Sequence, residues 1–181
     1  MTHEHDHALF KELLSGILSH PQKAVYNTVN GDRSSHLSID PAREDFPRLI
    51  GRARKNFNAL AALFALMEHR QGRDGRFYVV TPFGESEHLN KPFVRNTQWQ
   101  KLPLAQLIER LLLATGLDGE VDVDDLDEET TVVAICFGRV PPPIELPCPI
   151  ADAFRNALVA WGKNQGRNLV VEINIHQEVE P

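Results

Sequence analysis

Apolar residues follow two different spacings along this chain, and the change from one to the other marks the elements that the sequence predicts. In four segments they recur every three or four positions, as Phe10, Leu13, Leu14 and Ile17 do. This is the spacing of an amphipathic helix that buries one face. The predicted helices cover residues 8–19, 56–70, 104–115 and 152–163.

Between the helices, the pattern changes to alternation or to short runs of β-branched residues, and both are typical of strands. Asn30-Gly31 separates the first two strands and is expected to supply the positive φ angles of a tight hairpin turn. The predicted strands are residues 23–29, a segment containing Leu37 and Ile39, and residues 76–81, 120–123, 130–137 and 169–175.

The order of these elements predicts an α+β fold. A short helix between Asp45, a residue type favoured at N-caps, and Gly51 completes the first half as α-β-β-α-α-β. The second half repeats this order, except that five prolines within residues 140–149 exclude a regular helix at the corresponding place. Two similar structural units are therefore expected.

A short local identity supports the repeat. Gln71-Gly72-Arg73 and Gln165-Gly166-Arg167 both lie between the last helix and the last strand of their half. The predicted units are residues 8–81 and 104–175, joined by a linker over residues 82–103.

The net charge of −6 is unevenly distributed and narrows the classes of partner. Residues 1–90 hold 11 basic and 11 acidic side chains, whereas residues 91–181 hold 8 and 14. This excludes an overall basic surface for nucleic acid, so an anion site has to be local and is expected in the first half.

No apolar run approaches the roughly 18 residues of a membrane span. The polar, acidic N-terminus and the two cysteines favour a cytoplasmic protein without a membrane partner.

Positive charge is concentrated in the turn between the short helix and the helix over residues 56–70. Four cations lie within eight residues there, around a glycine. Helix N-terminal amides and cationic side chains both bind phosphate. The candidate binding residues are Arg48, Gly51, Arg52, Ala53, Arg54 and Lys55.

The same turn carries a family resemblance. Glu44-Asp45-Phe46 followed by Leu49-Ile50-Gly51-Arg52-Ala53-Arg54-Lys55-Asn56-Phe57 resembles the acidic helix start, IGxxG turn and apolar helix of type II KH domains, as in small bacterial single-KH RNA-binding proteins. For residues 104–175 the resemblance rests on element order alone. It implies two tandem type II KH-like units, each about α-β-β-α-α-β with a three-stranded sheet covered by helices. Such a pair would be similar to the tandem KH region of a bacterial transcription elongation factor.

The resemblance implies binding of single-stranded RNA at the turn, where glycines let main-chain amides approach the phosphates. Gly51 matches the first glycine of that turn, but Arg54 replaces the second. A side chain there would obstruct the RNA backbone or require a φ angle that arginine disfavours.

Two functions therefore stay open. One is an RNA-binding or RNA-protein adaptor module, and the other is a protein-interaction or scaffolding module that kept the fold and lost nucleic-acid binding. The second half has no GxxG turn, and it is expected to pack against the first or to bind a protein partner.

Other reactive residue types lack the spacing that catalysis or metal binding needs. His3, His5 and His7 alternate with acidic residues, and a solvated terminus is expected in preference to a metal tract. Six acidic residues between Asp122 and Glu129 lack the glycine and the helical flanks of an EF-hand. Cys148 has no neighbouring histidine or lysine to activate it. We expect no metal, no cofactor and no enzymatic activity.

Overall fold

The computed structural model describes residues 3–80, 101–139 and 145–175, which form an α+β fold. The first half contains α1 (His3–Ile17), β1 (Val25–Asn30), β2 (Ser34–Asp40), α2 (Phe46–Ile50), α3 (Lys55–Arg70) and β3 (Asp74–Val79). Two 3-10 turns, η1 (Pro21–Lys23) and η2 (Arg52–Arg54), precede β1 and α3. The second half contains α4 (Lys101–Thr115), β4 (Asp118–Asp125), β5 (Thr130–Arg139), α5 (Ile150–Asn164) and β6 (Asn168–Ile175). The α+β class and the order of elements predicted from hydrophobic spacing are confirmed.

Each half forms its own three-stranded sheet, in the order β1-β2-β3 and β4-β5-β6. In both sheets the first two strands are antiparallel and the last two are parallel. A parallel pair needs a crossover, and α3 and α5 supply it. Leu37 of β2 lies opposite Phe77 of β3, and Val133 of β5 lies opposite Val171 of β6. All four side chains are buried and face the helices.

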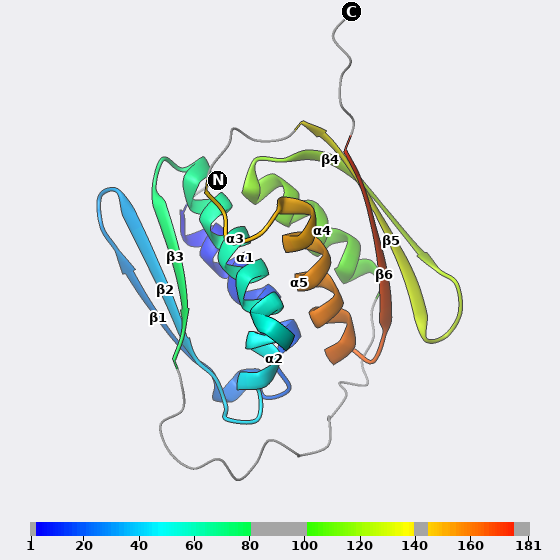
Figure 1. The fold of residues 1–181 in the computed structure, drawn as a ribbon, viewed down its shortest axis with the longest axis horizontal. Helices are drawn as coiled ribbons and strands as arrows, with labels where there is room; N and C mark the ends of the chain where they lie inside the picture. Colours follow the sequence, from blue (N-terminus) through cyan, green and yellow to red (C-terminus); the bar gives the residue numbers. More distant parts are fainter. Residues whose placement is uncertain (1–2, 81–100, 140–144, 176–181) are drawn as a thin grey trace, which may run out of the picture.

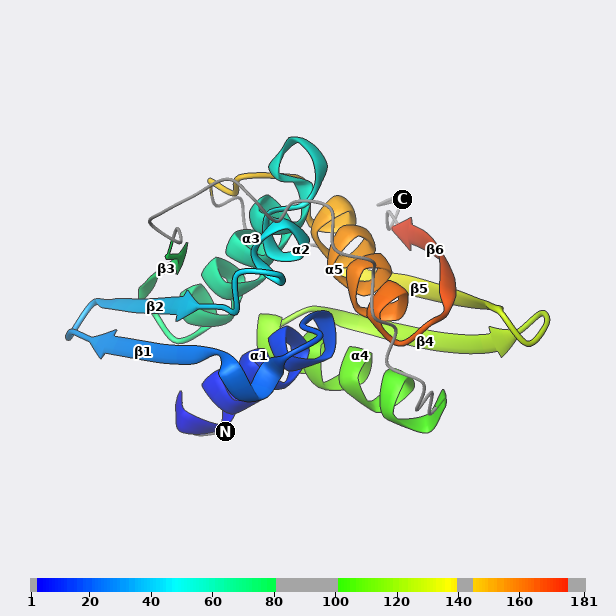
Figure 2. The same cartoon turned by 90° about the horizontal axis from the view of Figure 1, so that it is seen from below.

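The four long helices lie between the two sheets, as Figures 1 and 2 show from two directions. Helix α5 packs against both α3 and α1, and α4 also contacts these two helices. One hydrophobic core therefore contains residues of both halves, among them Phe10, Phe64, Ile108 and Phe154. The second half packs against the first, as its missing GxxG turn led us to expect. The proposed linker lies outside the described residues, apart from its last three residues, which belong to α4.

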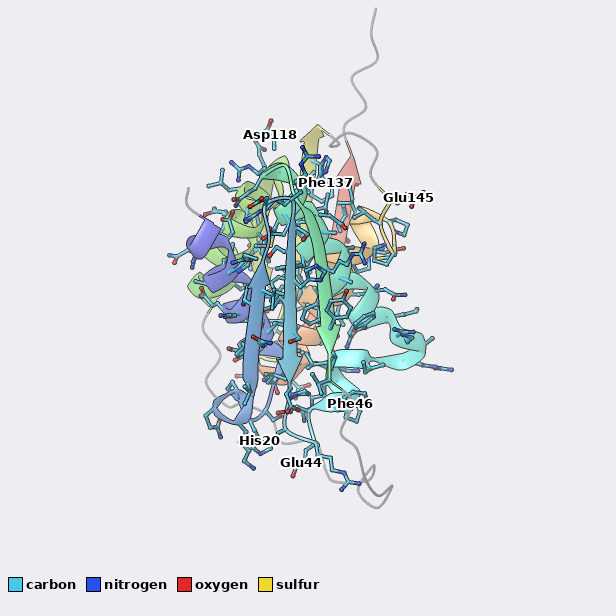
Figure 3. All side chains as sticks on the ribbon, turned by 90° about the vertical axis from the view of Figure 1, so that its left-hand side faces the viewer. His20, Glu44, Phe46, Asp118, Phe137 and Glu145 are labelled. Atoms are coloured by element: carbon cyan, nitrogen blue, oxygen red, sulfur yellow. The ribbon has the colours of Figure 1, made fainter. Side chains whose placement is uncertain are left out.

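The connection from β2 to α2 lies beside the end of α1. Figure 3 shows Glu44 and Phe46 at the same end of the molecule as His20, with Asp118, Phe137 and Glu145 at the other end. Asp45 occupies the N-cap position of α2, as predicted, but its side chain makes no cap hydrogen bond. Its two carboxylate oxygens accept hydrogen bonds from the main-chain amides of Ser19 and His20, each at 2.8 Å. The predicted position of Asp45 is therefore right, but the predicted capping by its side chain is wrong, because this buried carboxylate joins α2 to the segment that follows α1.

The N-terminal helix begins earlier than the hydrophobic spacing predicts, at His3 in place of Ala8. The expectation of a solvated terminus was wrong for Asp6 and His7, because both are buried. His7 Nε2 lies 2.7 Å from Oε1 of the buried Glu68 on α3. His7 therefore packs against α3, and Asp6 accepts a hydrogen bond from Gln71 just after this helix.

The hairpin between β1 and β2 also differs from the prediction. β1 ends at Asn30 and β2 begins at Ser34, and Gly31 N donates to Ser34 O at 2.8 Å across the connection. Neither Asn30 nor Gly31 has a positive φ angle. The expected two-residue turn is therefore replaced by a three-residue loop, which does not need left-handed backbone at these positions.

The repeated Gln-Gly-Arg segments have the same structure in both halves. Gly72 and Gly166 have φ angles of 74° and 77° after α3 and α5. The next amide, of Arg73 or Arg167, donates to the carbonyl five residues back, at 3.0 Å and 2.9 Å. This is a glycine-terminated helix end. The structural repeat therefore extends to the helix ends.

The two arginines of these segments have different partners. Arg73 Nε lies 3.1 Å from Oε2 of Glu68, whereas Arg167 Nη2 donates to Oδ1 of Asp125 at 2.8 Å. Residues 124–129 are exposed, in agreement with the predicted solvated acidic turn, although the first two of them, Asp124 and Asp125, belong to β4. Arg167 therefore anchors this turn.

No helix among the described residues combines the length and hydropathy needed to cross a membrane. Within the same ranges, no three histidine, cysteine or acidic side chains gather as a metal ion requires. The basic turn between α2 and α3 is the main candidate for a site.

Candidate functional site

The turn between α2 and α3 depends on Gly51. This residue ends α2 with φ 68° and ψ 170°, and its amide donates to Pro47 O at 2.8 Å. A side chain at this position would be strained at that φ angle. Its Cβ would also lie 2.7 Å from Cγ of Asn56. The first glycine of the predicted motif is thus required by both backbone and packing.

Ala53 and Arg54 adopt left-handed backbone conformations, with φ angles of 53° and 61°. Among the described residues they are the only non-glycine residues with positive φ. Each costs on the order of 1 kcal/mol relative to a right-handed conformation. The sequence-based concern about Arg54 is therefore confirmed: the turn requires a φ angle that suits glycine.

Asn56 holds this strained turn in place. Its Nδ2 donates to Arg48 O at 2.7 Å, which joins the first turn of α3 to α2. Arg54 N also donates to Gly51 O at 3.2 Å. Strained backbone persists where the surroundings fix it, and such places are often functional.

The cations predicted as one cluster point in different directions. Arg52, Arg54 and Lys55 are exposed, together with Ala53. Arg48 is only partly exposed, and its Nη1 donates to Oδ1 of Asn164 on α5 at 2.7 Å. The same Nη1 lies 3.8 Å from Asp45 Oδ1. Burial lowers the pKa of the Arg48 guanidinium, and the charge of Asp45 partly opposes this change. Arg48 therefore links the two halves.

Arg54 lies on the side of the turn that faces β3. Its guanidinium lies over the ring of Phe57, with Cζ 4.8 Å from the ring centroid. Phe57 is partly buried and packs near Phe77 of β3, with ring centroids 6.0 Å apart. Arg54 and Phe57 together offer a cation beside an aromatic ring, a pairing that single-stranded nucleic acids use for stacking.

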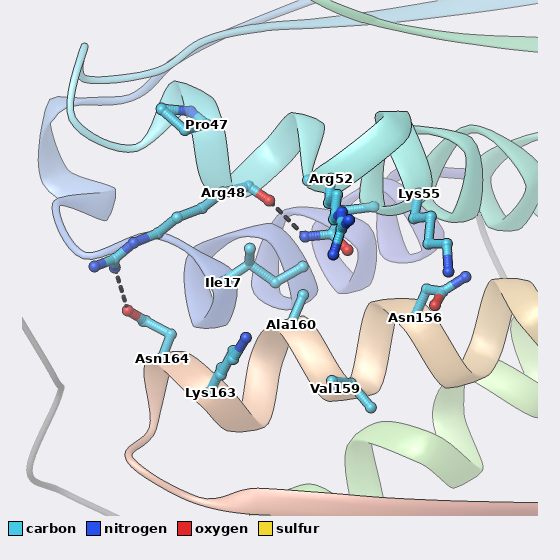
Figure 4. Close-up of a pocket in the computed structure, with 12 residues that line it drawn as sticks. Ile17, Pro47, Arg48, Arg52, Lys55, Asn156, Val159, Ala160, Lys163 and Asn164 are labelled. Carbon is cyan, nitrogen blue, oxygen red and sulfur yellow. Dashed lines mark hydrogen bonds between the residues drawn. The ribbon is translucent and has the colours of Figure 1, made fainter. Parts of the chain in front are cut away.

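Arg52 and Lys55 lie on the opposite side, where they border a pocket of about 380 Å³ between the turn and α5. Figure 4 shows Arg52 and Lys55 above this space and Lys163 of α5 pointing into it from below. The remaining lining residues are Ile17, Pro47, Arg48, Gly51, Asn56, Asn156, Val159, Ala160 and Asn164. Four lining residues are cationic and none is acidic. In a chain of net charge −6, this pocket attracts anions.

The sequence did not identify the contribution of α5. Asn156 and Lys163 lie about a hundred positions after Arg52 and Lys55, and no local spacing links the two segments. The apolar stripe of α5 predicts which face of this helix is buried. It does not predict which residues lie opposite the polar side chains beside that stripe, such as Asn156 and Lys163. Only the packing of α5 against α3 brings Lys163 to the basic turn.

The chain matches no protein-family model, and comparison with curated proteins and with solved structures gives no significant match.

Proposed function

We propose that this chain is a cytoplasmic, non-enzymatic binding protein that holds single-stranded RNA, alone or within an RNA-protein complex, at its α2–α3 turn. One observation carries the proposal. Residues 52–55 form an exposed, strained turn between two helices, and this turn borders a pocket whose lining is basic. A carboxylate-free basic surface of this kind is suited to phosphate groups.

The fold supports the resemblance to type II KH domains in two ways. The first half has the order α-β-β-α-α-β that the resemblance implies. The turn also has left-handed backbone at Arg54, where the family has a glycine. Arg54 therefore keeps the backbone path that the motif implies, and its side chain is directed over Phe57, away from the pocket.

In this mechanism Arg52, Arg54 and Lys55 contact phosphates of a strand that passes over the turn from one side to the other, and Phe57 offers a partly exposed ring to a base. Three phosphate contacts give a shallow salt dependence, with a slope of log K against log salt of about −2 for a single strand. We therefore expect weak binding that is strongest at low salt and falls by about ninefold between roughly 50 and 150 mM salt.

The test is fluorescence anisotropy of a labelled single-stranded RNA at 50 mM salt or below, roughly the range in which so few phosphate contacts remain measurable. An Arg52/Arg54/Lys55-to-Ala variant is expected to lose binding. The matched control, Lys23/Arg33/Arg76-to-Ala, removes three exposed cations elsewhere and lowers the net charge equally. Equal loss in both variants would mean that only overall charge matters. No binding by the unchanged protein would reject the proposal.

A second function, protein interaction, is favoured by the outer face of the second sheet. Glu120, Asp122 and Asp124 are exposed on β4, on the face opposite the buried Val123. Glu172 of β6 is also exposed. Ala134 of the central strand β5 pairs with Glu172 on one side and with Asp122 of β4 on the other, so the two acidic residues lie on the same face of the sheet. This acidic surface repels RNA and suits a basic protein partner. Partners that remain bound in a pull-down after nuclease treatment would support this function, and loss of all of them would contradict it.

A further inference from the structure

The pocket beside the basic turn is built by both halves of the chain. The turn supplies Arg52 and Lys55, and α5 supplies Lys163 and Asn156. The two sets of side chains face each other across the space in Figure 4. The second half, which lacks a GxxG turn of its own, thus adds a cation to the site of the first half.

The three exposed cations of this pocket have no acidic partner in the described part of the chain. The ion pairs found there do not involve Arg52, Lys55 or Lys163. The nearby carboxylate of Asp45 is buried, and both of its oxygens accept main-chain hydrogen bonds. Asp152, one turn before Asn156 on α5, is paired with Arg155 at 3.0 Å. Bringing like charges together without counter-charge is unfavourable, and a bound anion relieves it.

We propose that this pocket binds a terminal phosphate group, a phosphomonoester, carried by the 5′ end of an RNA strand or by a small phosphorylated molecule. The RNA form of the proposal rests on the proposed function, whereas the small-molecule form does not. A phosphomonoester carries a charge of about −1.5 to −2 at neutral pH, as phosphorylated side chains do. An internal phosphodiester carries a single charge, so the monoester matches three facing cations better.

The shape of the pocket also favours a chain end. An internal phosphodiester is continued by a nucleotide on each side and has to lie across the mouth, whereas a terminal phosphate can enter with its oxygens first. Ile17, Val159 and Ala160 form an apolar wall between the polar groups. A volume of about 380 Å³ lies at the lower end of the range typical of small-molecule sites. It has room for a phosphate and part of the sugar or base attached to it.

The cationic side chains of the lining and Asn156 have different parts in this arrangement. Arg52 offers the planar fork that binds two phosphate oxygens at once, and Lys55 and Lys163 act as point charges from opposite walls. Asn156 offers an amide donor from α5. Arg48 is fixed by Asn164 and sets the end of the pocket.

The test compares two oligoribonucleotides of one sequence, with a 5′-phosphate or a 5′-hydroxyl, and adds adenosine 5′-monophosphate as a small probe. The unchanged protein is expected to bind the 5′-phosphorylated strand about tenfold more tightly, as loss of one or two charge-assisted hydrogen bonds implies. Lys163→Gln is expected to remove most of this difference, because it weakens binding of the 5′-phosphorylated strand more than binding of the 5′-hydroxyl strand. Lys23→Gln, an equal change at an exposed lysine outside the pocket, is expected to change neither.

The outcomes separate the two proposals. Equal binding of the two strands by the unchanged protein overturns the RNA form of the pocket assignment and leaves RNA binding at the turn in place. If adenosine 5′-monophosphate also fails to bind, the pocket assignment as a whole is overturned. A difference that persists in Lys163→Gln also overturns it. Binding of adenosine 5′-monophosphate that Lys163→Gln abolishes, without binding of either strand, supports the pocket and rejects the proposed RNA function. Circular dichroism of each variant verifies that the fold is intact.

Discussion

Asn164 of α5 accepts a hydrogen bond at its Oδ1 from Nη1 of Arg48, at 2.7 Å, and so joins the second half of the chain to the helix that precedes the basic turn. Its Nδ2 donates to the carbonyls of Gly16 and Leu18, at 2.9 Å and 2.7 Å. Asn164 is buried, although asparagine is usually exposed. The side chain of Asn164 therefore has two roles. It donates hydrogen bonds to main-chain carbonyls at the end of α1, and it holds Arg48 in position.

The first prediction concerns this residue. Asn164→Ala removes the hydrogen bonds to Arg48, Gly16 O and Leu18 O, although Gly16 O keeps Gln165 Nε2 and Arg48 stays near Asp45. The free energy of unfolding should therefore fall by about 2–4 kcal/mol. The matched control is Asn156→Ala on the same helix, which should change it by less than about 0.5 kcal/mol. Urea denaturation measures both, and similar values for the two variants would contradict the role given to Asn164.

The close approach of α1 to α5 leads to the second prediction. A Cβ added to Gly16 would lie 1.9 Å from Nε1 of the buried Trp161. Alanine within a helix usually stabilises it by up to about 1 kcal/mol relative to glycine. Overpacking costs about 1–3 kcal/mol and here exceeds that gain, so Gly16→Ala should destabilise the protein by about 1–2 kcal/mol.

The control for this change is Gly31→Ala in the β1–β2 loop. Its nearest contact would be Ser34 Oγ at 3.2 Å, the end of a small side chain that can rotate. We expect little change in the thermal midpoint of that variant. A Gly16→Ala protein that melts at or above the temperature of the unchanged protein would rule out the close packing described between α1 and α5.

The third prediction concerns the left-handed conformation of Arg54. Arg54→Ala and Arg54→Gly both remove the contact with Phe57, but only glycine is relaxed at φ 61°. The glycine variant should therefore be more stable than the alanine variant by about 0.5–1 kcal/mol. At the exposed position Glu12 of α1, the same pair of substitutions should give the reverse order, because alanine favours a helix by about 1 kcal/mol. Denaturation curves of the four variants decide the sign at each position.

Cys148 provides a prediction about pH dependence. Burial raises the pKa of its thiol, and the negative charge of Asp152 raises it further. The reactive thiolate is therefore scarcer at neutral pH than in an ordinary cysteine. Alkylation of Cys148 by iodoacetamide should be slower in the folded protein than in urea, with its pH–rate profile displaced to higher pH. Asp152→Asn should move the profile back toward lower pH.

Peptide mapping separates the reaction of Cys148 from that of Cys136. The unfolded chain serves as the reference at each pH, since it removes both burial and the fixed position of Asp152. Equal rates in the folded and unfolded protein would show that the thiol is not shielded.

The sequence predicted the parts of the fold that depend on local patterns. The stripe through Phe10, Leu13 and Leu14 identified a core-facing helix, and Gly51 identified the position of the turn. Both signals arise from neighbours in sequence, either through helical period or through the special backbone of glycine.

The parts that were missed depend on contacts between distant residues. The buried position of His7 results from Glu68, and the role of Asp45 results from the amides of Ser19 and His20. Lys163 belongs to the basic pocket only because α5 crosses α3. None of these pairs has a characteristic spacing, since tertiary packing alone determines which polar groups meet. The tertiary structure therefore divided the predicted basic cluster into an anchored Arg48, a pocket side and a side that faces β3.

The placement of all four long helices between the two sheets has a consequence for folding. Each sheet buries only one face, and the helices that cover it obtain part of their own burial from the helices of the other half. Neither half can complete its core alone, so unfolding is expected to be cooperative across the chain, with one transition in place of two. Native-state hydrogen exchange would then report similar opening free energies for the amides of α3 and α5, although about eighty residues lie between these helices in the sequence.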